Sequence, residues 1–494
     1  MQEIALPSSL AECHALIRQL LTIVQHEHTQ NEALASKLAA LEARMNQNSG
    51  NSSRPPSSNF GQNTPKQTPK QTTQPGIPKE PKAQGGQKGH TGNTLEKIEH
   101  PDEIVQLSTP ICSCGELLSI EDAKIAQTYQ VFDIPQPKLY VTEYQRLEQK
   151  CTCGKVHLGG LPAHIHANVQ YGSGVRALTT LLSNSCQLSY QKVRTLFNDL
   201  FGYDLNESTA LTNNQVIYEA LEPTEERIKA ALLKSPAVHF DESGLKVGKA
   251  LYWLHVACTT VLTFLFVHPK RGKKAHIDSP SILQEFKNTA IHDCFSTYFA
   301  YINCLHALCN PHLLRELTFQ KEQGKPWATQ IYDFLIDIYK RTEKGTIPIE
   351  NIQIVKEQWK NICKDAIILE DILLAQRTPL PELTLFDIQA KKRGRSPRGK
   401  ALALLDRLLL HTDAILAFAE FEVVPFSNNQ AERDIRPIKT KLKIAGCFRT
   451  TNGAERYARI QGFISTCRKN KVNVFNELKK LAQNPLEYSA PFGC

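Results

Sequence analysis

The chain has 494 residues, of which 41% are hydrophobic and 22% charged, as in a folded globular protein rather than a disordered or fibrous one. This length predicts two to four folded units. No apolar run reaches the roughly 20 residues needed to span a bilayer, so we expect no membrane segment. A formal net charge of +9 is a modest excess that suits an anionic partner such as nucleic acid without establishing one.

The first residues show no basic stretch followed by an apolar one, so we expect a protein that stays in the cytoplasm. In that compartment the 14 cysteines are interpreted as reduced thiols or metal ligands rather than as a disulfide framework. Several, such as Cys258 and Cys304, lie in apolar stretches typical of small buried side chains.

Residues 8–47 contain few helix breakers and carry an apolar repeat of seven residues. One row of the repeat consists of Leu10, Ile17, Val24, Asn31, Leu38 and Met45. A second row consists of Cys13, Leu20, Glu27, Leu34 and Leu41. The pattern predicts a coiled-coil dimerisation helix over 1–48, and hence a homo-oligomer, although an amphipathic helix packed on its own protein stays open.

Residues 49–98 change composition abruptly and become rich in Pro, Gln, Thr, Gly and Lys, with Phe60 as the single aromatic. Such a segment buries too little apolar surface to offset the entropy of ordering. We predict a disordered basic linker, whose lysines either touch DNA phosphates or are simply solvated.

Residues 99–165 hold two short cysteine pairs, each followed directly by glycine. Cys112 and Cys114 lie in ICSCGE, and Cys151 and Cys153 lie in KCTCGK. Four thiolates suit a tetrahedral structural zinc, so we predict a zinc-ribbon-like module. Four reduced cysteines in turns are the alternative, with His157 as a substitute ligand.

Residues 166–235 carry apolar residues at helical spacing. Two short helices, at about 188–201 and 207–219, flank a turn that contains Gly202. This arrangement predicts a helical DNA-binding domain of the helix-turn-helix kind, with a plain three-helix unit as the alternative.

Residues 236–312 change to strand-like runs. AVHFDESGLKV, LYWLHVAC and VLTFLFVHP predict an antiparallel meander, followed by a helix in DSPSILQEF. TAIHDCFSTYFAY and YINCLHA predict a fourth and a fifth strand, before a helix from about Asn310. This order of elements is that of an RNase H-like sheet.

Residues 313–420 are predicted to form a helical insertion, in which the basic stretch KKRGRSPRGK is a loop suited to phosphate contacts. Residues 421–494 would complete the core. Their first helix is expected to start at a cap formed by Asn428 and Asn429 and to carry Glu432. The predicted fold class is therefore multidomain α+β.

Two-metal phosphodiester chemistry requires carboxylates that converge from different elements. Three carboxylates suit this requirement, although spacing alone does not single them out among the 49 Asp and Glu residues. Asp241 is in the first strand-like run, Asp293 near the end of the fourth, and Glu432 on the downstream helix. In an RNase H-like sheet the first and fourth strands are neighbours, so the aspartates would meet. Magnesium keeps several waters, so few protein oxygens suffice.

The residues around these carboxylates form VHFDESGLKV, IHDCFSTYFAYINCLHALCNPHLLREL and VPFSNNQAERDIRPIKTKLKIAGCFRTTNGAERYARIQGFISTCRKN. With NSSRPPSSNFG and GGQKGHTGN in the linker and the paired cysteine turns, they closely resemble the IS66 family of bacterial insertion-sequence transposases. The resemblance covers nearly the whole chain, to about residue 480, and the NNQAER block is its most specific part.

The resemblance implies a DDE transposase that excises an element at its terminal inverted repeats and joins it to new double-stranded DNA. It places Asp241, Asp293 and Glu432 on the three catalytic positions, with Mg²⁺ or Mn²⁺ as the cofactor. It also implies a zinc-binding module, from which the C-x-C pairs depart by their tight spacing. A nucleoid-associated location and small accessory proteins as partners follow from the same resemblance.

Further residues are interpreted with their alternatives. Four basic residues near Glu432 are expected to contact DNA: Arg433, Arg436, Lys439 and Arg449. Surface ion pairs with Asp434 or its neighbours are the alternative for the first two. Glu455 is the rival third carboxylate, and Glu242 is expected on the opposite strand face.

Three histidine or cysteine residues recur every third position, at His306, Cys309 and His312. At that spacing on one helix they would not converge on a metal ion, so packing or a DNA-facing role is favoured. Three rival functions stay open: a non-transposing nuclease, an inactive DNA-binding regulator derived from a transposase, and a structural zinc protein.

Overall fold

A computed structural model describes most of the chain. It leaves out residues 1–8, 46, 49, 52–94, 108–110, 112, 118, 120, 122–123, 163, 279–280, 344, 376–398 and 493–494. The predicted linker lies almost wholly outside the described residues, as do Cys112 and most of the KKRGRSPRGK loop. The described residues fall into two compact units. One draws on Met1–Ile77, Ala167–Ser189 and Ser208–Cys494, and the other on Pro78–His166 and Tyr190–Glu207.

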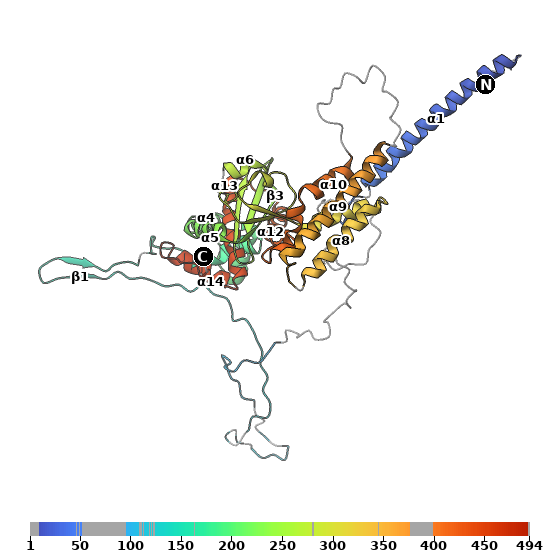
Figure 1. Ribbon diagram of the computed structural model, residues 1–494. Helices are drawn as coiled ribbons and strands as arrows, with labels where there is room; N and C mark the ends of the chain where they lie inside the picture. The colour runs from blue at the N-terminus through green and yellow to red at the C-terminus, as the bar shows by residue number, and fades with distance from the viewer. Residues whose placement is uncertain are drawn as a thin grey trace. The chain divides into compact units, whose positions relative to one another are not determined.

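The second unit contains one antiparallel strand pair, β1 (Glu148–Lys150) with β2 (Val156–Leu158), and helix α3 (Tyr190–Phe201) (Figure 1). The turn between the strands is closed by a hydrogen bond from the Cys151 amide to the carbonyl oxygen of Lys155, at 2.8 Å. Gly154 adopts a φ of 87° in this turn, a value that explains why glycine follows the cysteine pair.

A five-stranded mixed sheet is the centre of the first unit. Its strands are β3 (Ala237–Val247), β4 (Ala250–Cys258), β5 (Thr263–His268), β6 (Thr289–His292) and β7 (Leu305–Leu308). Their order across the sheet is β5-β4-β3-β6-β7. The first three pair antiparallel as a meander, whereas β6 runs parallel to both β3 and β7. The predicted neighbourhood of the first and fourth strands is thus present.

The two faces of the sheet are buried against different helices because successive side chains of a strand alternate. Phe264 and Phe266 of β5 share a core with α5 (Glu222–Lys234). Leu265 and Val267 share the other core with α12 (Asn429–Ala445) and α13 (Thr451–Lys469).

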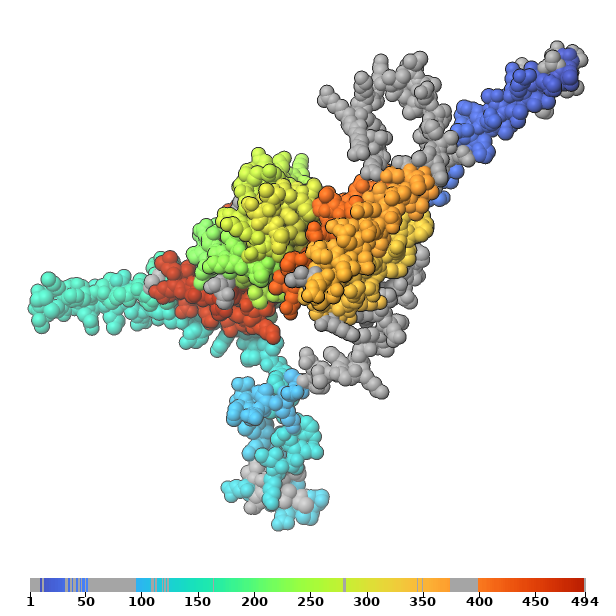
Figure 2. Space-filling view, in the orientation of Figure 1, coloured from blue at the N-terminus to red at the C-terminus, as the bar shows by residue number. Residues whose placement is uncertain are grey.

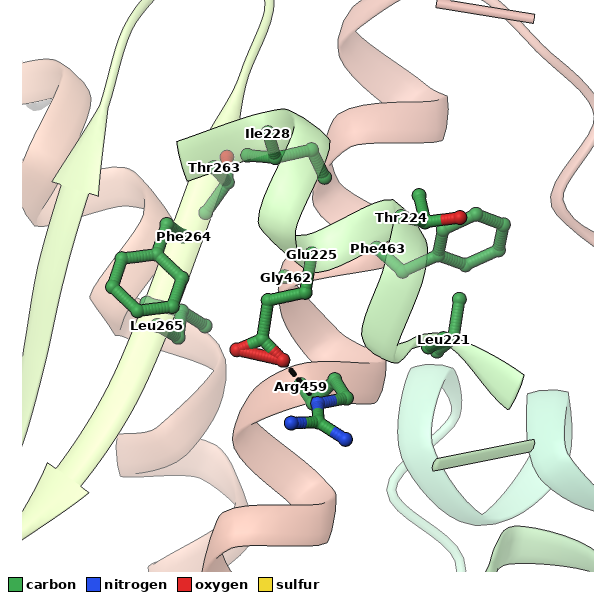
Figure 3. A pocket seen from close by; sticks show the side chains of 10 residues that line it. All are labelled: Leu221, Thr224, Glu225, Ile228, Thr263, Phe264, Leu265, Arg459, Gly462 and Phe463. Carbon is green, nitrogen blue, oxygen red and sulfur yellow. Dashed lines mark hydrogen bonds and ion pairs between the residues drawn. The ribbon is translucent and has the colours of Figure 1, made fainter. Parts of the chain in front are cut away.

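Helix α13 approaches β5 closely at Gly462, where an added Cβ would lie 3.2 Å from the carbonyl oxygen of Thr263. One turn earlier, Arg459 forms an ion pair with Glu225 of α5 (Figure 3). A larger residue at Gly462 would therefore push α13 away from the sheet.

A helical layer packs beside the sheet. It comprises α7 (Asn310–Glu322), α8 (Pro326–Thr342), α9 (Ile349–Ala375), α10 (Lys400–Leu410) and α11 (Thr412–Glu420). One side of this layer is visible as a packed yellow-to-orange surface (Figure 2). Its core contains Trp327, Trp359 and Leu405. Trp359 donates its indole N–H to the carbonyl oxygen of Leu408 at 3.0 Å, so its one polar group is satisfied inside that core.

A smaller helical cluster packs against the C-terminal helices. It includes α2 (Ser173–Thr180), the short π-helical turn η2 (Leu181–Ser185), α4 (Glu207–Ala220) and α14 (Val474–Gln483). Helices α3 and α4 match the two helices predicted at about 188–201 and 207–219. Whether they act as a helix-turn-helix stays a prediction.

Helix α1 (Leu10–Met45) matches the predicted N-terminal helix. Its apolar seam side chains are largely exposed in the single chain, as Ile17 (53%), Val24 (62%) and Leu38 (59%) show. Dimerisation stays a prediction. Of the helices that the structure describes, none is long and apolar enough to cross a membrane.

Three predicted elements were wrong in kind or in extent. The helix in DSPSILQEF is replaced by α6 (Lys273–Ile277) and by turns that bury Ile282, Leu283 and Phe286, because helical apolar spacing also suits a buried turn. The fourth strand ends at His292 rather than continuing to Tyr301, and the fifth starts only at Leu305.

Candidate active site

Asp241 lies in the middle of β3, the central strand of the sheet. It alternates with Phe240 and Glu242, so it shares the strand face of His239, Leu245 and α12. Burial raises the pKa of its carboxyl well above the usual range, and the negative charges of Glu242, Asp293 and Glu432 add to the shift. Asp241 is therefore a half-buried acid in the field of other acids.

Asp293 follows β6 directly. The last paired position of β3 and β6 joins His239 to Ile291, two residues before each aspartate, so the parallel register places Asp241 level with Asp293. The Asp293 carboxylate accepts a hydrogen bond from the Phe295 amide at 3.0 Å, and this turn ends the strand. Burial raises the pKa of Asp293, against the opposing charge of Arg271.

Glu432 is in the first turn of α12, which starts where the sequence predicted. Burial raises the pKa of its carboxyl, Asp293 adds to the shift, and the positive charges of Arg315 and Arg436 oppose it. The three predicted carboxylates thus come from β3, the end of β6 and α12. The charges of Asp293 and Glu432 act on Asp241, and the charge of Asp293 acts on Glu432.

Asn428, which precedes α12, attaches this helix to the strands. Its side-chain amide donates to the carbonyl oxygen of Phe240 at 2.8 Å and accepts from Nδ1–H of His239 at 2.8 Å. Its backbone N–H donates to the Cys309 sulfur at 3.1 Å. The side chain predicted to cap the helix instead links it to the strand that carries Asp241. The sequence offered no signal for this link, which spans 189 residues to His239.

Glu242 faces away from Asp241, as expected from strand alternation. It forms an ion pair with Arg271 at 2.7 Å and accepts a hydrogen bond from the hydroxyl of Tyr298. Arg271 is held between the rings of Trp253 and Phe295, with its guanidinium carbon 5.0 and 4.1 Å from their centroids. No pattern in the sequence pointed to Arg271.

Cys309 and His312 converge with Glu432, which corrects the expectation for the His306, Cys309 and His312 series. His306 lies in strand β7 and contacts His292 at 3.0 Å, so the three residues do not share one helix. The ligand atoms of Cys309, His312 and Glu432 instead lie within 4.8 Å of one another. Burial raises the pKa of the Cys309 thiol to about 12 and lowers that of His312 to about 3.

The predicted DNA contacts lie on and after α12. Arg433, Arg436 and Arg449 are exposed. Desolvation lowers the pKa of Lys439, and the negative charge of Asp241 opposes that shift, so this ammonium lies in the field of the acidic site. Asp434 is buried and pairs with Lys469 at 2.6 Å, so the alternative of surface ion pairs with Asp434 was wrong.

Glu455, the rival third carboxylate, lies on α13, where its charge raises the pKa of Tyr218. The charge of Glu432 acts on Asp241, whereas Glu455 is not among the charges that act on Asp241, Asp293 or Glu432. The choice of Glu432 as the third member stays a prediction.

The described thiols of the two cysteine turns are exposed to solvent. Cys114, Cys151 and Cys153 are all exposed, and hydrogen bonds from Cys153 lower the pKa of the Cys151 thiol. Because Cys112 lies outside the described residues, the four-cysteine zinc site stays a prediction.

Two family models match the chain. A family of unknown function, DUF6444, matches residues 3–96, which include the N-terminal helix and linker. No curated protein matches the sequence. The family described as "Transposase IS66 family" matches residues 168–456, more than half of the chain, and this stretch contains all three carboxylates. The protein is a member of the IS66 transposase family.

Proposed function

We propose that this transposase binds the terminal inverted repeats of an insertion sequence, cleaves the ends and joins them to target DNA. The observation that carries the proposal is the acidic site itself. Asp241, Asp293 and Glu432 come from three separate elements. The charges of Asp293 and Glu432 raise the pKa of Asp241, and the charge of Asp293 raises that of Glu432. Such an arrangement costs stability unless cations balance it, so a function must maintain it.

The fold supports an RNase H-like catalytic core. An antiparallel meander followed by two parallel strands, in the order β5-β4-β3-β6-β7, places the first and fourth strands side by side. The helical layer from α7 to α11 stands between these strands and α12 in the sequence, as expected for an insertion before the final carboxylate.

The residues fit divalent metal ions. Carboxylate oxygens are the ligands that Mg²⁺ and Mn²⁺ prefer, and Asp241 lacks an ion pair among the described residues. Two such ions would activate the attacking oxygen and stabilise the leaving oxygen. Among the described residues, these three carboxylates do not form a group whose ligand atoms all lie within 4.8 Å of one another.

The other residues would position the DNA and the carboxylates. Asn428 holds the start of α12 against β3 and so fixes Glu432 relative to Asp241. Arg433, Arg436, Lys439 and Arg449 would neutralise backbone phosphates at the cleaved strand. The proposal also includes dimerisation through α1, a zinc-stabilised cysteine module and small accessory proteins encoded by the same element.

Cleavage and binding of a labelled element end test the proposal. Wild-type protein should cut the terminal repeat in Mg²⁺, and Asp241→Asn should abolish cutting while retarding the same DNA in a gel. Binding without cleavage by the wild type would make the protein a DNA-binding regulator instead. Equal cleavage by wild type and Asp241→Asn would refute the assignment of the site.

A further inference from the structure

Three side chains of different chemistry converge at the start of α7 and α12. The Cys309 thiol, the His312 imidazole and the Glu432 carboxylate offer one ligand atom each, and all three atoms lie within 4.8 Å of one another. In the part of the chain that the structure describes, no other group of three metal-ligating residues is this compact. Cys309 is buried and the other two are half-buried, so a small ion would be shielded from solvent.

The donor set differs from that of a magnesium site. Magnesium takes oxygen ligands, whereas a thiolate and an imidazole select softer divalent ions, above all Zn²⁺. Three protein ligands also leave the fourth position of a tetrahedral ion open to water, as in zinc sites with three protein ligands.

The imidazole of His312 is not held by the protein's own hydrogen bonds. Its Nδ1 is buried without a hydrogen-bond partner among the described residues. Its Nε2 lies 3.9 Å from Oε1 of Glu432, beyond hydrogen-bond distance. Two ligands bound tetrahedrally at about 2.0–2.1 Å would stand about 3.3 Å apart. A closure of roughly half an ångström would therefore seat an ion between these two atoms.

The sulfur of Cys309 already accepts a hydrogen bond. The backbone N–H of Asn428 donates to it at 3.1 Å, and Cys309 stands at the N-terminus of α7. Both features stabilise a thiolate, which is the form that binds metal. Burial acts in the opposite direction and raises the pKa of the metal-free thiol, so a bound cation would have to displace its proton.

We propose that Cys309, His312 and Glu432 bind a thiophilic divalent cation of the Zn²⁺ class. Binding forms bonds to the sulfur, an imidazole nitrogen and a carboxylate oxygen, and it releases the thiol proton to solvent. Glu432 is also one of the three carboxylates of the proposed magnesium site. An ion bound to Cys309 and His312 therefore withdraws Glu432 from that site and inhibits DNA cleavage. The binding stands on this geometry alone, whereas the inhibition rests on the proposed function.

Cobalt titration of metal-free full-length protein tests the binding, because Co²⁺ replaces Zn²⁺ and colours thiolate sites. Cys309→Ser should bind one Co²⁺ fewer per chain than wild type and lose part of the thiolate-to-cobalt absorption. Cys363→Ser, which changes another buried cysteine in α9, should match wild type. The cysteine turns contribute equally to all three titrations.

His312→Gln provides a second variant that keeps every thiol. It should weaken the same Co²⁺ ion at least tenfold, which keeps the test decisive if Cys309→Ser does not fold. Equal stoichiometry and equal spectra for wild type and His312→Gln would overturn the proposal.

The inhibitory consequence is measured separately. Adding Zn²⁺ to Mg²⁺-dependent cleavage should lower the rate of wild type at least tenfold, and Cys309→Ser should need at least tenfold more Zn²⁺ for the same inhibition. Equal sensitivity would overturn the competition for Glu432. If wild type cuts no DNA in Mg²⁺ alone, the proposed function fails, and the cobalt titration still decides the metal site.

Discussion

The two regions for which the sequence predicts metal ligands hold those ligands in different ways. Strand register places Asp241 and Asp293. The start of α12, which Asn428 attaches to β3, places Glu432. Around Cys151, the thiols are exposed in a turn, and nearby apolar side chains such as Val131 (90%) and Tyr140 (89%) are exposed as well.

Because of this difference, a bound metal should affect the fold differently at the two sites. In the carboxylate site the core positions the ligands, and bringing like charges together opposes folding until cations arrive. In the cysteine region the described residues bury little apolar surface, so the energy of metal binding would have to supply the order. Metal should therefore change activity at one site and structure at the other.

The largest expected effect is on catalysis at the third carboxylate. Glu432→Gln keeps the size of the side chain but removes a ligand charge, so cleavage of a labelled element end should fall by about three orders of magnitude or more. Glu455→Gln is the matched control on α13 and should stay within a few-fold of wild type. The reverse result, with Glu455→Gln inactive and Glu432→Gln active, would show that the wrong glutamate was assigned.

Removal of zinc should act on structure. A chelator, or Cys151→Ser, should expose residues 99–165 to limited proteolysis about tenfold faster, because a structural zinc site contributes folding energy directly. In Cys151→Ser, which leaves the other proposed metal ligands intact, the midpoint of thermal unfolding of the sheet domain should not change. If the protein is purified without zinc and its digestion pattern is unchanged, the cysteine pairs form ordinary turns and do not bind a structural zinc.

Asn428→Ala tests whether the hydrogen bonds of Asn428 attach α12 to β3 and so place the carboxylates before metal binds. The change leaves the ring of His239 and the carbonyl oxygen of Phe240 without their partner, and each lost buried hydrogen bond costs about 1–3 kcal/mol. Urea unfolding should show a loss of roughly 2–4 kcal/mol. Asn473→Ala removes an exposed cap from α14 and should cost about 1 kcal/mol. Equal losses in the two variants would mean that Asn428 is only a cap.

Asp241→Asn should stabilise the metal-free protein at pH 7. The folded pKa of Asp241 is raised, so the folded state holds this proton more tightly and wild type loses stability as pH rises above the unfolded value. The variant lacks that loss, and Mg²⁺ should stabilise wild type more than the variant. Asp337→Asn, on the exposed face of α8, is the control and should change neither quantity. A lower unfolding temperature for Asp241→Asn in metal-free buffer would contradict the prediction.

Local patterns predicted much of this architecture. The strand-like run AVHFDESGLKV predicted β3, and strand geometry predicted that Glu242 faces away from Asp241. The heptad rows predicted the bounds of α1 to within two residues at each end. DSPSILQEF was assigned the wrong element because Ile282, Leu283 and Phe286 have a spacing that a helix and a buried turn share.

Contacts between residues far apart in the chain could not be predicted from sequence patterns. Asn428 reads as a helix cap, and only the folded chain shows its amide bound to β3. Cys309 and His312 form a compact group because α12 brings Glu432 to the start of α7, more than 100 residues away in sequence. Arg271 has no sequence signature, because its role depends on two rings that fold around it.

Binding of Mn²⁺ to the full-length protein tests the central claim most directly. Mn²⁺ replaces Mg²⁺ at oxygen sites, and two ions about 3.5–4 Å apart couple magnetically. Electron paramagnetic resonance should show a coupled pair of Mn²⁺ ions per chain in wild type. That pair should disappear in Asp241→Asn and in Glu432→Gln but persist in Glu455→Gln. An uncoupled signal that is the same in all four proteins would contradict a two-metal site at these carboxylates.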